Sequence, residues 1–165
     1  MAITGRAVNS GGVPVWIRAI NSFTKRMVRL GVPMGPMILL TVRGRKTGRL
    51  YTTPLGMFER DGRRWLFAEF GAVDWVHNLR VFGEATVSRG RTREAVTVSE
   101  LPAEAAAVVL HDIVAPWFKT PMGAMARMVA GRPIFKVALD APLERFIDEA
   151  PLHPVFEVTA QGAGR

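Results

Sequence analysis

Residues 37–69 read MILLTVRGRKTGRLYTTPLGMFERDGRRWLFAE and contain the signals of three consecutive antiparallel strands. Its first six residues, 37–42, form a short apolar run typical of a strand buried on both sides. A tight basic turn follows, and residues 51–59 are predicted as a second strand. Asp61-Gly62 is a strong hairpin signal, so the chain is expected to return over residues 64–69 as a third antiparallel strand.

Further short strands are predicted on the C-terminal side of this stretch. Residues 85–89 and 94–101 alternate as a hairpin, residues 134–139 are a candidate strand, and residues 155–159 are expected to close the sheet. About five strands joined by short turns predict a small antiparallel barrel and not a doubly wound sheet.

Helices are predicted around the barrel. The expected ranges are 13–30, 75–82, 102–114, 122–130 and 143–149, with Pro116 and Pro121 breaking the chain between the third and fourth. We expect residues 1–12 to be a flexible arm. Residues 13–165 are expected to form one domain with an N-terminal amphipathic helix and a helical C-terminal insertion.

The N-terminal helix has an apolar stripe with basic residues beside it. The stripe consists of Trp16, Ile20, Phe23, Met27 and Leu30. One interpretation is a helix that covers an end of the barrel; the other is a helix that lies on an anionic membrane surface. The sequence leaves both open.

Composition narrows the chemistry. The chain has 165 residues, no cysteine, three histidines and a net charge of +8. Thiolate chemistry is excluded, and no metal-ligand spacing or catalytic triad is present. The charge favours anionic partners, but the aromatic residues sit in apolar runs, so nucleic-acid binding is not expected. The first residues lack a signal-peptide pattern, which predicts a cytoplasmic protein.

Two motifs carry the functional signal. The first is the basic turn of residues 43–49. Its glycines allow the backbone to come close to a ligand, and its cations suit phosphate or carboxylate oxygens. The alternative interpretation of this turn is a solvated hairpin tip without a ligand. The second is Trp75-Val76-His77-Asn78, which places Trp75 and Asn78 on one helix face. An asparagine amide suits the edge of a heterocycle, whereas Trp75 could equally plug the barrel.

Taken in order, these motifs resemble the deazaflavin-dependent nitroreductase and quinone reductase family of actinobacteria. The shared marks are an apolar strand, the GRKTG turn, Pro54-Leu55, Asp61-Gly62 and the Trp75–Leu79 segment, over roughly residues 36 to 100. The resemblance implies an α+β fold, a split β-barrel like that of flavin reductases with flanking helices. It also implies an oxidoreductase that uses coenzyme F420 rather than FMN and reduces a lipophilic acceptor such as a quinone or nitroaromatic, often at the inner face of the membrane. Related barrels often form homodimers.

The resemblance also implies which residues bind the cofactor, while no catalytic residue is assigned because the deazaflavin itself transfers the hydride. Arg45 and Lys46 would contact its phosphate and glutamyl tail, and the other positions would support the turn or hold the ring. The cofactor-binding residues implied are Gly44, Arg45, Lys46, Thr47, Gly48, Arg49, Pro54, Leu55, Trp75 and Asn78.

Two positions depart from the family pattern. Glu69-Phe70 stands where relatives have a Ser-Lys segment, and Tyr51 replaces an arginine. These departures favour an alternative: a repurposed, non-catalytic member that binds a lipid or a tetrapyrrole-like ligand in its barrel. Aromatic and methionine residues in the last third are candidates either for an acceptor pocket or for the core. They are Trp117, Phe118, Met122, Met125, Met128 and Phe135.

Overall fold

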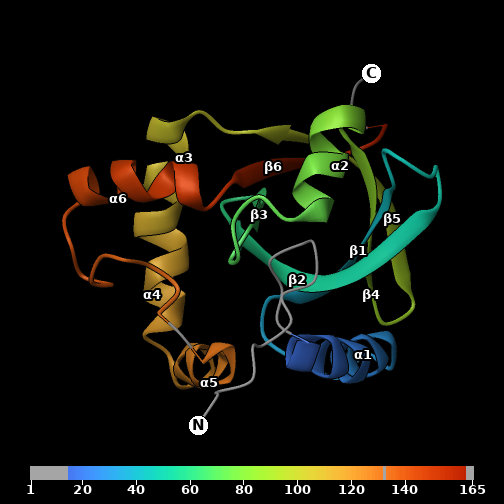
Figure 1. Cartoon of the computed structure of the whole chain (residues 1–165), viewed down its shortest axis with the longest axis horizontal. Coiled ribbons are helices and arrows are strands. Elements are labelled where there is room, and N and C mark those ends of the chain that lie inside the picture. The colour runs from blue at the N-terminus through green and yellow to red at the C-terminus, as the bar shows by residue number, and fades with distance from the viewer. Residues whose placement is uncertain (1–14, 132, 163–165) are drawn as a thin grey trace, which may run out of the picture.

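The chain folds into a closed antiparallel barrel with helices on its outside (Figure 1). The computed structural model describes residues 15–131 and 133–162, so the expected arm of residues 1–12 lies outside the described residues. Six strands follow the order β1-β2-β3-β6-β5-β4 around the barrel. Their bounds are β1 Met37–Arg43, β2 Leu50–Arg60, β3 Arg63–Phe67, β4 Glu84–Arg89, β5 Thr92–Glu100 and β6 Val155–Ala160. The expected α+β fold with a small antiparallel barrel and flanking helices is confirmed.

The register of β1 against β2 determines which side chains face the barrel interior. Ile38 pairs with Leu55, and Leu39 pairs with Pro54. Because successive side chains of a strand point to opposite faces, Leu55 lies inside the barrel and Pro54 lies on its outer face. Ile38 and Leu55 belong to the apolar cluster that fills the interior.

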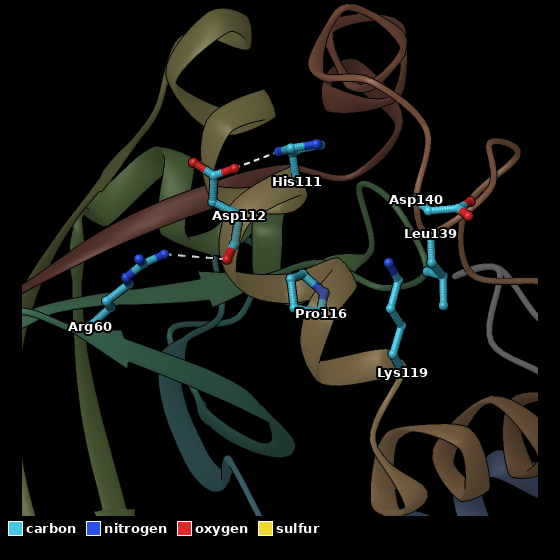
Figure 2. Close-up of a pocket in the computed structure, with 7 residues that line it drawn as sticks. All are labelled: Arg60, His111, Asp112, Pro116, Lys119, Leu139 and Asp140. Atoms are coloured by element: carbon cyan, nitrogen blue, oxygen red, sulfur yellow. Dashed lines mark hydrogen bonds and ion pairs between the residues drawn. The ribbon is translucent and has the colours of Figure 1, made fainter.

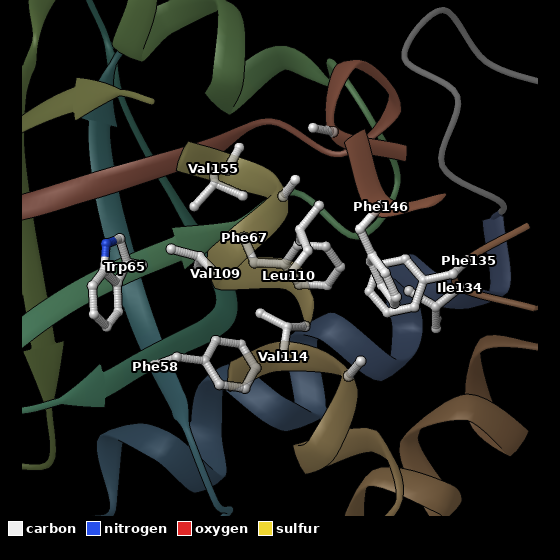
Figure 3. Packing of buried hydrophobic residues seen from close by; sticks show 14 of the residues in the cluster. Phe58, Trp65, Phe67, Val109, Leu110, Val114, Ile134, Phe135, Phe146 and Val155 are labelled. Carbon is white, nitrogen blue, oxygen red and sulfur yellow. The ribbon is translucent and has the colours of Figure 1, made fainter. Parts of the chain in front are cut away.

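A second apolar cluster lies between the outside of the barrel and the C-terminal helices (Figure 3). Phe58, Trp65 and Phe67 project outward from β2 and β3 into this cluster, where they meet Leu110 and Phe146. The alternation of β3 explains both clusters, because Leu66, between Trp65 and Phe67, belongs to the interior one. The C-terminal helices therefore cover one side of the barrel.

The helices occur close to their expected positions. Their bounds are α1 Val15–Arg29, α2 Asp74–Phe82, α3 Ala103–Val109, α4 Ala115–Phe118, α5 Pro121–Ala130 and α6 Leu143–Glu149, with a π-helix η1 over Leu110–Val114 and a 3₁₀ turn η2 over Ala150–Leu152. In the described part of the chain, no helix combines the length and the apolar character needed to cross a bilayer.

Two local expectations were wrong. Residues 134–139 are not a strand, because Ile134 and Phe135 are buried in the outer cluster and the Lys136 amide donates to Glu149 Oε1 at 2.9 Å instead of to a sheet. Pro116 does not break the third helix, which runs through the π-helix into α4. Proline lies at the start of α4, and the Asp112 carbonyl four residues before it accepts from Arg60 Nη1 at 3.4 Å. A side-chain donor thus replaces the N–H that proline lacks.

Candidate cofactor site

The basic turn between β1 and β2 is closed by its own backbone hydrogen bonds. The Gly48 amide donates to the Gly44 carbonyl at 2.8 Å, and the Gly44 amide donates to the Arg49 carbonyl at 2.7 Å. Gly48 has a φ of 70°, a left-handed conformation that favours glycine. The two glycine amides are therefore used inside the turn.

An aromatic side chain lies over this turn. A Cβ added to Gly44 would clash with the ring of Tyr51, so any other residue at this position would force that ring to move. The Tyr51 hydroxyl lies 3.0 Å from Thr47 Oγ1, which also accepts from the Arg49 amide at 3.2 Å. Tyr51, which replaces an arginine of the family pattern, thus supports the conformation of the turn and supplies no charge.

Arg45 joins the turn to the start of α2. Its backbone amide and its Nη1 both donate to Asn78 Oδ1, at 3.1 and 2.9 Å. The guanidinium also contacts Asp74 Oδ1, at 3.3 Å from Nη1 and 3.2 Å from Nη2. Asn78 is only 4% exposed. The two motifs that the sequence singled out are therefore in direct contact, through a pairing of Arg45 with Asp74 and Asn78 that sequence reasoning did not foresee.

This arrangement leaves a defined set of donors for an anion. Among the described residues, the backbone amides of Lys46 and Thr47 have no hydrogen-bond partner, and neither the Lys46 ammonium nor the Arg49 guanidinium has an ion pair. Lys46, Thr47 and Arg49 are all exposed. Two amides and two cations on one exposed turn are a donor set that fits phosphate and carboxylate oxygens.

The remaining candidates lie on different faces of the barrel. Trp75 is half-buried, packs against the interior cluster that contains Leu55, and has its ring centroid 5.9 Å from that of Phe156. Trp75 thus closes one end of the barrel. Pro54 lies on the outer face beside Leu39. Leu55 and Trp75 thus belong to the same interior cluster, whereas Pro54 lies on the outer face.

Sequence reasoning missed Asp74. The sequence does contain a signal for it: Asp74 directly precedes the tryptophan of the W-x-x-N motif. It is the first residue of the helix, where the helix dipole favours a carboxylate.

It also missed a buried polar network behind the segment that leads into α2. His153 and Glu149 are 7% and 2% exposed, and His153 Nε2 lies 3.3 Å from Glu149 Oε2. His153 Nδ1 lies 3.2 Å from the carbonyl oxygen of Ala68, the residue before the divergent Glu69-Phe70. This network fixes the chain between β3 and α2, the helix that carries Asp74 and Asn78.

A cleft of about 450 Å³ lies elsewhere (Figure 2). It is lined by Arg60, His111, Asp112, Pro116, Lys119, Leu139 and Asp140. Arg60 ends β2, whereas the basic turn precedes its first residue, Leu50. At about 3.3 Å per residue the two sites lie roughly 30 Å apart along the strand, so the cleft is separate from the candidate cofactor site.

The candidates for an acceptor pocket divide into two groups. Phe118 and Phe135 are buried in the outer cluster, against which Trp117 packs, so these aromatic residues are core. Met122, Met125 and Met128 of α5 are exposed at 43%, 60% and 80%. None of these residues lines the cleft.

The chain is thus a closed antiparallel barrel whose basic turn is docked on a W-x-x-N helix. Residues 16–125 match the model of the F420H(2)-dependent quinone reductase family, and the chain belongs to that family. The protein is accordingly an oxidoreductase whose cofactor is F420, as the sequence resemblance implied. The donors on the exposed turn suit this anionic cofactor.

Several solved structures are similar to this chain. An F420-H2 dependent reductase is 22% identical, with 75% of this chain and 94% of that chain covered and a TM-score of 0.44. A general stress protein 26-related protein of the pyridoxinephosphate oxidase family from Clostridium acetobutylicum is 14% identical, with 84% of each chain covered and a TM-score of 0.46. No curated protein matches the chain.

Proposed function

We propose that this chain transfers hydride from reduced F420 to a lipophilic acceptor, a quinone or a nitroaromatic. The deazaflavin supplies the hydride when it is bound. The protein positions the cofactor: Lys46, Thr47 and Arg49 hold the phosphate and glutamyl groups, and the half-buried Trp75 offers an apolar surface near the ring. The observation that carries the proposal is the set of unpaired donors on a turn that Arg45 fixes to α2.

The interior of the barrel argues against the alternative of a lipid or tetrapyrrole held inside it. Side chains of the interior cluster fill that space, and Leu40, Leu66 and Val96 are fully buried there. A ligand of that size would have to displace the core. The exposed turn and the end of the barrel under Trp75 are better placed to take a cofactor.

A fluorescence titration tests the cofactor site. We expect saturable quenching of oxidised F420 and little binding of FMN run in parallel. Lys46→Ala and Arg49→Ala should each weaken F420 binding about tenfold or more, since a hydrogen bond to a charged group contributes roughly 1.5–3 kcal/mol. Arg91→Ala is the matched control, because it removes a cation from another exposed hairpin turn. Equal affinities of all three variants for F420 would overturn the assignment of the site. In a separate assay, turnover with menaquinone or with a nitroaromatic identifies the class of acceptor.

A second proposal concerns the membrane, and exposed apolar residues favour it. Helix α1 packs on the barrel through Thr24 and Val28, which are 7% and 1% exposed, whereas Phe23 and Leu30 of the expected stripe are 63% and 73% exposed. The helix is therefore attached to the barrel and still presents apolar side chains to the outside. Burial and the charge of neighbouring Arg29 lower the pKa of Lys25, one of the cations of this helix.

Helix α5 adds to this apolar surface. It lies along the same edge of the molecule as α1 (Figure 1), and its Met122 lies beside Gly35, in the segment after α1. Met125 and Met128, on the same helix, are exposed. Apolar side chains with Arg26 and Arg29 nearby fit an anionic lipid surface.

Co-sedimentation with vesicles tests this contact. The protein should bind vesicles that contain phosphatidylglycerol more strongly than neutral ones, and Phe23→Ser with Met128→Ser should reduce binding several-fold. Val81→Ser is the control, since Val81 is 60% exposed on α2. Unchanged sedimentation would exclude the contact. If the double variant instead converts a dimer into a monomer in light scattering, a second copy of the chain covers this surface.

A further inference from the structure

The carboxylate of Asp74 lies against the basic turn. Its Oδ1 is 3.3 Å from Nη1 and 3.2 Å from Nη2 of Arg45, and Nη1 also lies 3.4 Å from the Asp74 carbonyl oxygen. The Asp74 side chain is 70% exposed and that of Arg45 is 25% exposed. The charge of Arg45 is thus compensated within the protein, on the side where a cofactor would approach.

The position of Asp74 in its helix favours the same arrangement. Asp74 is the first residue of α2, and the preceding Val73 forms no side-chain capping bond. A negative charge in the first turn is stabilised by the helix dipole. The carboxylate of Asp74 therefore lies between a helix N-terminus and a guanidinium. Without Asp74, an anionic group of a ligand could take this place.

We propose that Asp74 sets the charge preference of the cofactor site. By neutralising Arg45 it leaves Lys46 and Arg49 as the cations that hold the anionic part of a ligand. Arg45 then acts as a positioning residue that fixes the turn to α2, and the site discriminates against ligands with a more negative tail. This inference rests on the proposed cofactor site.

Asp74→Asn tests the proposal by removing one charge while it keeps an acceptor oxygen near Arg45. We expect this variant to bind F420 about three- to tenfold more tightly. An exposed ion pair corresponds to a factor of roughly 1.5 to 5 in an equilibrium constant, and the loss of repulsion between Asp74 and the tail adds to it. The uncharged deazaflavin core without phosphate and glutamyl groups should bind both proteins equally.

Two further variants identify the cause of such a gain. Asp61→Asn removes the same charge at the opposite end of β2; Asp61 is 90% exposed on its side chain and has a φ of 52°, which asparagine also tolerates. It should leave F420 affinity unchanged. In an Arg45→Ala background, Asp74→Asn should give a smaller gain, because no guanidinium is released.

The outcomes separate this inference from the proposed function. An Asp74→Asn affinity for F420 that is unchanged or weaker, or a gain equal to that of Asp61→Asn, overturns the inference. If the unmodified protein binds no F420, the proposed function fails. In that case tripolyphosphate is the probe, and its binding is measured by NMR from the shifts of the Lys46 and Thr47 amide signals. Tighter binding of tripolyphosphate to Asp74→Asn than to Asp61→Asn supports the inference, and equal binding overturns it.

Discussion

Asn78 and Arg45 are separated by 33 residues and joined by two hydrogen bonds to a single oxygen. Asn78 Oδ1 accepts from the Arg45 amide at 3.1 Å and from Arg45 Nη1 at 2.9 Å. The contact converts two separate sequence motifs into one site, because it fixes the turn between β1 and β2 against α2.

Replacing Asn78 by alanine should therefore affect both stability and cofactor binding. The Arg45 amide would lose its partner in a largely buried place, which costs roughly 1–3 kcal/mol. Chemical denaturation should show this loss, and F420 titration should show weaker binding. Asn21→Ala, a similar change in the half-buried part of α1, is the control and should alter stability by less than about 0.5 kcal/mol. Equal stability of the two variants would contradict a structural role for Asn78.

The two basic residues in the middle of the turn should behave differently. Arg45→Ala removes the bonds of the guanidinium to Asn78 and Asp74 and keeps the backbone bond to Asn78, so it should lower the free energy of unfolding by about 1–2 kcal/mol and also weaken F420 binding. Lys46→Ala removes an exposed side chain with no partner among the described residues, so it should weaken binding and leave the unfolding midpoint unchanged. The pair is checked by denaturation and titration of the same samples; an identical loss of stability in both would contradict the different roles.

The buried network behind α2 should contribute more to stability than any surface ion pair. Glu149 accepts from the Lys136 amide and lies at ion-pair distance from His153, whose other ring nitrogen faces Ala68. Glu149→Ala removes the acceptor of the Lys136 amide and a buried neighbour of His153, and should cost roughly 1–3 kcal/mol. Glu144→Ala removes an exposed carboxylate of the same helix and should be nearly neutral. Thermal unfolding compares the two, and a loss below about 1 kcal/mol for Glu149→Ala would contradict this role of the network.

Stability in acid should depend on Glu94. Arg64 donates to both of its carboxylate oxygens, at 2.6 and 2.9 Å, and these hydrogen bonds lower the pKa of Glu94 from its ordinary value of 4.5. A carboxylate with a lowered pKa stabilises the fold above its ordinary pKa, and this contribution is lost as the pH falls through the folded-state value.

Glu94→Gln should consequently be less stable than the unmodified protein near pH 7, by about 0.5–1 kcal/mol for a partly exposed pair. The difference should shrink as the pH is lowered below 4.5. Urea denaturation over this pH range measures the change, and Glu84→Gln, at the exposed start of β4, provides the control. A difference that does not vary with pH would show that Glu94 stabilises the fold by packing alone.

Local patterns were sufficient for most of the architecture. The apolar run of residues 37–42, the Asp61-Gly62 turn and the glycine after residue 82 all specify their elements through contacts within a few residues. Residues 134–139 had the composition of a strand, but the sheet was already closed by β6, and burial of Phe135 among the C-terminal helices decided their conformation. The N-terminal helix was predicted, yet over residues 20–29, whose side chains the structure describes, Thr24 and Val28 are buried while Phe23 stays exposed.

Periodicity, turn chemistry and an ordered set of motifs are local properties of the chain, and they were enough to predict the barrel, the family and the basic turn. How the charges of that turn are used depends on contacts between distant parts of the chain. The Arg45 side chain is paired with Asp74 and Asn78, whereas the side chains of Lys46 and Arg49 have no ion pair among the described residues. Such pairing depends on where α2 docks on the barrel, and docking is determined by packing between residues that are far apart in the sequence.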